Sequence, residues 1–113
     1  MKKLYPKKVT KMTEKHKSRY MTKAINEELN VKLQMTLWQL MDILALKRKD
    51  KMDYLQVFDI IVSGSRLKII NKQEHPYMVE KFININGNTI TKSITVWIID
   101  DIDKQTMLFP SDY

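Results

Sequence analysis

Few residues of this chain combine the types and the spacing that catalysis requires. The two histidines, His16 and His75, have neither a second histidine nor a cysteine at metal-ligand spacing. His75 follows Glu74, but adjacent residues of a strand point to opposite faces, so a surface histidine in a turn is the simpler interpretation. The only glycines, Gly64 and Gly87, fall in expected turns, which leaves no Gly-rich phosphate loop and no nucleophile elbow. We therefore predict no catalytic residue, no cofactor and no enzymatic activity.

Three acidic residues, Asp100, Asp101 and Asp103, form the feature closest to a metal site. Closely spaced carboxylates after a strand can bind Mg²⁺ or Ca²⁺. An EF-hand loop would also need a glycine and a distant glutamate, which are missing here. Aspartate commonly ends strands, because its side chain hydrogen-bonds to the nearby backbone. We therefore assign no metal ligand.

Basic residues are concentrated near the N-terminus. Residues 1–23 contain nine basic residues and one acidic residue, whereas the rest of the chain contains eleven and twelve, so the first segment supplies the net charge of +7. Lysines bind phosphates without reading base sequence. We predict contacts with RNA, DNA or an acidic partner for Lys7, Lys8, Lys11, Lys15, Lys17 and Arg19. The alternative is a solvated tail whose lysines reflect AT-rich coding.

Length and composition limit the architecture. A chain of 113 residues suits one domain. It has no cysteine, which fits a reducing cytoplasm, and no apolar run approaches the roughly 18 residues that a membrane span needs. We expect a mobile basic arm over residues 1–18 and a single cytoplasmic domain over residues 19–113, with no membrane partner.

Residues 30–49 are the one segment whose pattern predicts a helix clearly. Asn30 is a good N-cap, and Lys47 to Lys49 suit the negative end of the helix dipole. The apolar residues at helical spacing form one stripe, which should pack on the core: Leu33, Leu37, Leu40, Met41 and Leu44.

The remaining segments are typical of strands. Residues 19–25 allow a strand before the helix, and four more follow it at residues 54–62, 66–73, 77–85 and 90–99, separated by turns of hairpin length. We therefore predict an α+β fold, with one amphipathic helix packed on a four- to five-stranded, mainly antiparallel sheet in the order β-α-β-β-β-β. The tail from Lys104 to Tyr113 is too apolar to lie wholly in solvent.

The helix carries a second set of apolar residues on its other side, where Val31, Met35 and Trp38 lie with Leu46. A helix that is apolar on two sides is normally covered on both. The cover is either the chain's own tail around residues 107–109, or another molecule. In the second case Val31, Met35 and Trp38 form a protein interface, with a homodimer as one possibility.

Several segments together resemble the domain-of-unknown-function family numbered nine-sixty, from Gram-positive bacteria and their phages and mobile elements. The resemblance covers about residues 19–113, and it is carried by residues 19–23, 25–28, 37–42, 53–58, 73–74, 98–101 and 106–108. It implies a compact α+β protein with no established activity and no catalytic residue. Such a setting favours an accessory or inhibitor-type protein that binds a host protein or nucleoprotein. Direct, sequence-independent RNA or DNA binding by the basic arm is the alternative.

Overall fold

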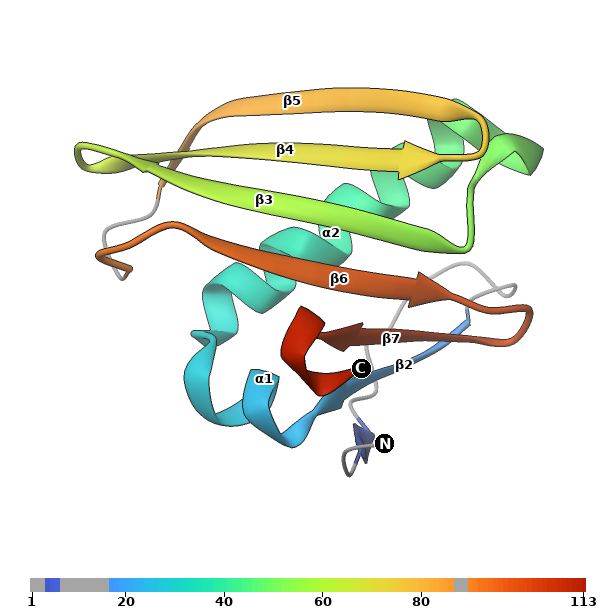
Figure 1. Cartoon of the computed structure of the whole chain (residues 1–113), viewed down its shortest axis with the longest axis horizontal. Helices are drawn as coiled ribbons and strands as arrows, with labels where there is room; N and C mark the ends of the chain where they lie inside the picture. The colour runs from blue at the N-terminus through green and yellow to red at the C-terminus, as the bar shows by residue number, and fades with distance from the viewer. Residues whose placement is uncertain (1–3, 7–16, 87–89) are drawn as a thin grey trace.

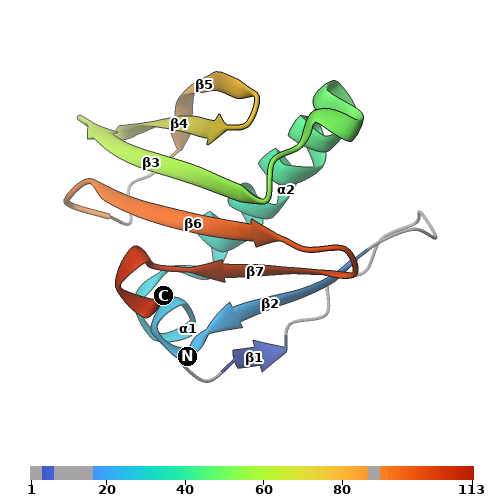
Figure 2. The same ribbon diagram turned by 45° about the vertical axis from the view of Figure 1, so that its right-hand side comes forward.

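The computed structural model describes residues 4–6, 17–86 and 90–113 (Figure 1). One long helix lies behind a single twisted sheet, so the molecule has two layers (Figures 1 and 2). The elements in chain order are β1 (Leu4–Pro6), β2 (Ser18–Thr22), α1 (Lys23–Glu28), α2 (Val31–Arg48), η1 (Lys49–Lys51), β3 (Leu55–Ser63), β4 (Arg66–Glu74), β5 (Tyr77–Asn86), β6 (Ile94–Asp100), β7 (Lys104–Leu108) and η2 (Pro110–Asp112).

The predicted α+β class and the main helix are confirmed. The Asn30 side chain accepts a hydrogen bond from the Leu33 N–H at 3.0 Å, which satisfies one of the free donors at the start of α2. All members of the predicted apolar stripe are buried: Leu33, Leu37, Leu40, Met41 and Leu44. They pack on the alternate residues of β3, β4 and β6 that face the helix, among them Phe58, Ile69 and Val96.

The sheet has more strands than predicted. Its order is β1-β2-β7-β6-β3-β4-β5, and all neighbours are antiparallel except β2 and β7, which are parallel. The tail after Asp103 was one of the two covers considered for the second apolar side of the helix. It forms a strand instead, β7, which lies between β2 and β6. Residues 4–6 of the expected arm also pair, as β1 against β2.

Two element boundaries were predicted wrongly. The strand expected over residues 19–25 ends at Thr22, because the Thr22 hydroxyl accepts a hydrogen bond from the Ile25 N–H at 3.3 Å and begins α1 instead. The strand expected from residue 90 begins at Ile94. Among the described residues, no helix is both long enough and apolar enough to cross a membrane.

Candidate functional site

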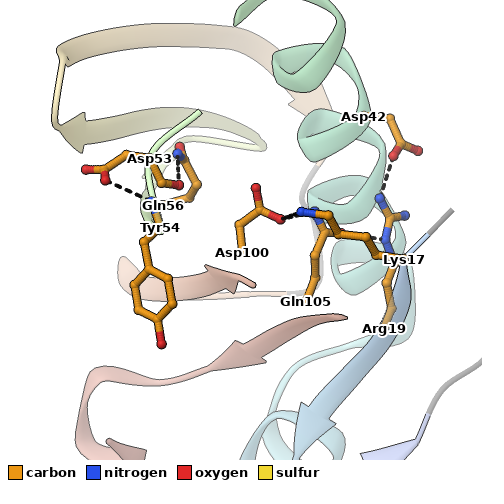
Figure 3. A network of polar contacts seen from close by, with 8 residues as sticks. All are labelled: Lys17, Arg19, Asp42, Asp53, Tyr54, Gln56, Asp100 and Gln105. Atoms are coloured by element: carbon orange, nitrogen blue, oxygen red, sulfur yellow. Dashed lines mark hydrogen bonds and ion pairs between the residues drawn. The ribbon is translucent and has the colours of Figure 1, made fainter. Parts of the chain in front are cut away.

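The acidic cluster belongs to the turn between β6 and β7. The Asp100 carboxylate accepts hydrogen bonds from Lys17 Nζ at 2.7 Å and from Gln105 Nε2 at 2.9 Å (Figure 3). The Asp101 N–H donates to the Lys104 carbonyl at 2.8 Å, which closes the turn. Within the described ranges, no three His, Asp or Glu residues are grouped so as to hold a metal ion. The Asp100 carboxylate thus joins the turn to the start of β2.

Arg19 lies inside the molecule, which corrects its prediction as a phosphate contact. Its side chain is 3% exposed, its Nε donates to Gln105 Oε1 at 2.9 Å, and its Nη2 contacts the Asp42 carboxylate (Figure 3). Lys17 is held by Asp100, as described above. The other four predicted contacts, Lys7, Lys8, Lys11 and Lys15, lie outside the described residues.

Trp38 is also buried, at 1% exposure, so it is not part of an exposed interface. The guanidinium carbon of Arg19 lies 4.8 Å from the centroid of the Trp38 ring, within cation–π range. Arg19 Nη1 and Trp38 Nε1 have no hydrogen-bond partner in the described part of the chain, so packing and the ring contact hold this pair together. Trp38 is therefore covered by β2 of its own chain.

The outer side of α2 remains open. Val31 is 61% exposed, Met35 38% and Leu46 78%, so the chain's own tail does not cover these residues. Ile43, at 44%, joins them. We call these four residues the α2 outer stripe.

A buried cluster of polar side chains pins the C-terminal end of α2 to the sheet. Arg48 Nη1 donates to Gln73 Oε1 at 2.9 Å, and Gln56 Nε2 donates to the same oxygen at 2.8 Å. Burial lowers the pKa of Arg48, and nearby Glu80 offsets part of this effect. Gln56 of β3 and Gln73 of β4 face α2, and Arg48 belongs to α2 itself. All three side chains are buried, so the cluster fixes the helix on the sheet and does not form an open site.

His75 lies exposed in the turn between β4 and β5. Its backbone N–H donates to Asp53 Oδ2 at 2.9 Å, as the Glu74 N–H does at 3.2 Å. Partial burial would raise the pKa of Asp53, but these hydrogen bonds and one from the Tyr54 N–H outweigh that effect and lower it. The local geometry is that of a capped turn, with Glu74 and His75 tied through their backbone.

One side of the sheet faces away from α2. In Figure 1, α2 crosses behind the sheet and η2 lies in front of its β7 end, while the fronts of β3, β4 and β5 are bare. Side chains alternate between the two faces of a strand, so the neighbours of the buried Phe58, Ile60 and Ile98 point to this side. We call it the open face.

The open face is largely apolar. One row across five strands consists of Leu108, Trp97, Val57, Lys72 and Val79, each paired with the next. Leu108 is buried at 4% exposure, Trp97 and Val57 are half-buried, and Val79 is exposed, so the row opens toward β5. Further apolar residues extend this row in both directions: the half-buried Leu55, Ile61 and Ile70, the exposed Ile83, and Ile99, which is buried. The C-terminal Tyr113 contacts the Trp97 ring at 6.0 Å between centroids.

The charges near the centre of the open face neutralise each other. Lys72 Nζ lies 2.8 Å from Asp59 Oδ2, and the Thr95 hydroxyl donates to the same carboxylate at 2.8 Å. Burial would raise the pKa of Asp59, but the bonds from Lys72 and Thr95 lower it, and Asp59 raises the pKa of Lys72. An apolar surface with a neutralised centre is typical of a protein interface rather than of a phosphate-binding surface.

A hollow of about 770 Å³ adjoins the open face where β6 begins. Its wall includes Ala24 from α1, Ile94 and Thr95 from β6, and Phe109 and Pro110 near the C-terminus. Sequence reasoning did not single out either the open face or this hollow. The sequence of β3 does contain a signal for the open face, because apolar residues occur at both its odd and its even positions, which point to opposite faces of the sheet.

The fold and its surfaces define a small α+β protein in which one helical layer covers one face of a mixed sheet. The chain belongs to the family described as staphylococcal protein of unknown function (DUF960), which matches residues 18–112. The family resemblance predicted from the sequence is thereby confirmed.

A solved structure supports the fold independently. The crystal structure of a protein of unknown function from Enterococcus faecalis has a TM-score of 0.71 and 21% sequence identity, and covers 86% of this chain and 91% of that chain. At this level of identity the likeness concerns the fold alone. Comparison with curated proteins finds no match.

Proposed function

We propose that this chain is a cytoplasmic, non-enzymatic binding protein, derived from a phage or mobile element, that acts as an accessory or inhibitor of a host protein or nucleoprotein. The observation that carries the proposal is the open face. An antiparallel sheet with one solvated face normally has polar residues there. Here β3 places Leu55, Val57 and Ile61 on that side.

Contiguous exposed apolar surface is uncommon on monomers and typically marks a contact with another molecule. The open face suits a protein partner, because it is largely apolar and the charges of Lys72 and Asp59 near its centre neutralise each other. Free positive charge lies toward its margin, at Lys68 and Lys81, neither of which has an ion pair with a described carboxylate.

Val57→Glu tests the open face by placing a carboxylate in the middle of the apolar row. Glutamate fits a half-exposed strand position, so the fold should remain. We expect the tagged variant to lose the partner that the wild-type chain captures from its native host, as shown by mass spectrometry after nuclease treatment. Circular dichroism and the thermal midpoint check that the variant is folded.

Leu46→Glu is the matched control, since it makes a similar change on the α2 outer stripe at 78% exposure. Partner capture should survive this substitution. If Leu46→Glu abolishes capture and Val57→Glu does not, the interface is the α2 outer stripe and the open-face proposal is wrong.

Nucleic-acid binding through the basic N-terminal segment is the second candidate, and the excess of positive charge in residues 1–23 supports it. Because β1 pairs with β2, charge removal is a cleaner test than deletion. Replacing Lys7, Lys8, Lys11 and Lys15 by Gln should weaken binding of a labelled oligonucleotide and reduce its salt dependence. Unchanged affinity in fluorescence anisotropy would exclude this role.

A further inference from the structure

The outer edge of β5, at the margin of the open face, is a second feature that favours the binding of a partner. β5 ends the sheet order and, among the described residues, pairs only with β4; its ten residues contain no proline. Along such an edge, alternate backbone N–H and C=O groups point outward and remain free to bind another strand. Figures 1 and 2 show β5 at the margin of the sheet in both views.

This edge is held in place from behind. Glu80, on the helix-facing side of β5, forms an ion pair with Lys47 of α2 at 2.9 Å. Phe82, two residues further along, packs against the core. A strand fixed in this way binds an added strand with little loss of its own conformational freedom.

The exposed side chains of β5 continue the apolar row of the open face. Tyr77 is 72% exposed, Val79 39% and Ile83 64%, and all three point to the open side. An added strand would cover them with its own alternate residues. The usable length ends near Ile83, because Asn84 has a φ of 62° where the register with β4 shifts.

Charge decides which kind of strand fits. Residues 66–86 contain four basic residues, Arg66, Lys68, Lys72 and Lys81, and two acidic residues, Glu74 and Glu80. Two copies joined edge to edge would bring equal positive charges together, and an exposed lysine such as Lys81 commonly protects an edge against such pairing. An acidic segment would instead bring carboxylates near Lys81 and Lys68, which form no ion pair with a described carboxylate.

We propose that β5 binds an extended, acidic segment of a partner protein as an additional strand. Apolar residues of that segment contact Tyr77, Val79 and Ile83, and one of its carboxylates lies near Lys81. This inference rests on the proposed function and names the class of partner and the way in which it docks. It explains why the apolar surface reaches the edge of the sheet instead of ending on β4.

A library of random 12-residue peptides displayed on phage, selected on the full chain, supplies the probe. The best peptide is then synthesised with a fluorescent label. We expect alternating apolar residues and an acidic residue in the selected sequences. Bound peptide should slow amide hydrogen exchange at alternate residues between Tyr77 and Ile83.

Lys81→Glu should weaken this peptide about tenfold, since an attractive charge contact becomes a repulsive one. Lys104→Glu makes the same change on β7, away from the edge, and should alter affinity less than twofold. The inference is overturned if no selected peptide protects β5, if both variants bind alike, if a labelled 12-nucleotide oligodeoxythymidylate displaces the peptide, or if sedimentation shows that the chain dimerises through β5.

The captured host partner separates this inference from the proposed function. If Val57→Glu abolishes capture and Lys81→Glu does not, the open face remains the interface and the edge inference alone fails. If neither substitution reduces capture, both fail.

Discussion

At the scale of single residues, two side chains with apparent surface roles belong to one buried pair. Arg19 and Trp38 are 19 positions apart, on β2 and α2, and contact each other in the interior. The positive charge of Arg19 is balanced by Asp42 and held by Gln105. Trp38, which the sequence placed at a possible protein interface, is therefore a core residue that contributes to stability.

Trp38→Ala should lower the free energy of unfolding by about 3 to 5 kcal/mol, because it leaves a large cavity and removes the contact for Arg19. Urea denaturation followed by circular dichroism measures the change. Val31→Ala, on the α2 outer stripe, should change the same quantity by less than about 0.5 kcal/mol. A similar small loss in both variants would show that Trp38 is not a core residue in solution.

Asp53 makes the folding stability of the molecule depend on pH in the acid range. Its folded-state pKa is lowered, so its contribution to stability is fully present above the ordinary carboxyl pKa of about 4 and is lost as the pH falls through the folded value. Asp53→Asn removes the titrating group. The free energy of unfolding should therefore fall less between pH 7 and pH 3 in this variant than in the wild type. Equal losses would contradict the assignment.

At the scale of elements, α2 combines strong local signals with tertiary packing. Its cap, its buried stripe and its basic last turn all act within the helix, so pattern reasoning located it to within a residue at each end. The polar cluster around Gln73 then fixes its C-terminal end on β3 and β4.

Asn30→Ala should destabilise the protein by about 1 kcal/mol, because the N–H of Leu33 loses its acceptor at the start of α2. Asn30→Ser restores an acceptor of suitable length and should recover most of the loss. Thermal unfolding monitored at 222 nm compares the two. If serine is no better than alanine, the cap does not contribute as the geometry indicates.

At the scale of the whole molecule, β2 and β7, which are far apart in the sequence, lie side by side in the sheet. β7 pairs with β6 on one side and with β2 on the other, and Thr106 stands opposite Ile99 and Tyr20. Without β7, β2 and the short β1 would have no connection to the other strands. The last strand of the sequence is therefore central to the fold.

Thr106→Pro should cost about 2 to 4 kcal/mol, since proline removes a ladder donor and leaves a buried carbonyl without its partner. Thr106→Val preserves the β-branched shape and the backbone N–H, and should be nearly neutral. Guanidinium unfolding of the two variants gives the comparison. Equal stability would mean that β7 is dispensable.

The sequence by itself determined the features that depend on near neighbours. Asn30 begins α2, apolar residues at helical spacing select its buried side, and alternation between turns marks β3, β4 and β5. These signals are local, because backbone hydrogen bonds in a helix and in a hairpin join residues close in the chain. The family also followed from such segments.

Only the tertiary structure decided which surfaces are covered. The contact of Arg19 with Gln105 spans 86 positions, and no local pattern specifies that β7 enters beside β2. Apolar residues on both sides of β3 are equally consistent with a strand between two layers, and the fold supplies one layer only. The open face, and with it the candidate site, is therefore a consequence of where α2 packs and where the chain has no second helical layer among its described residues.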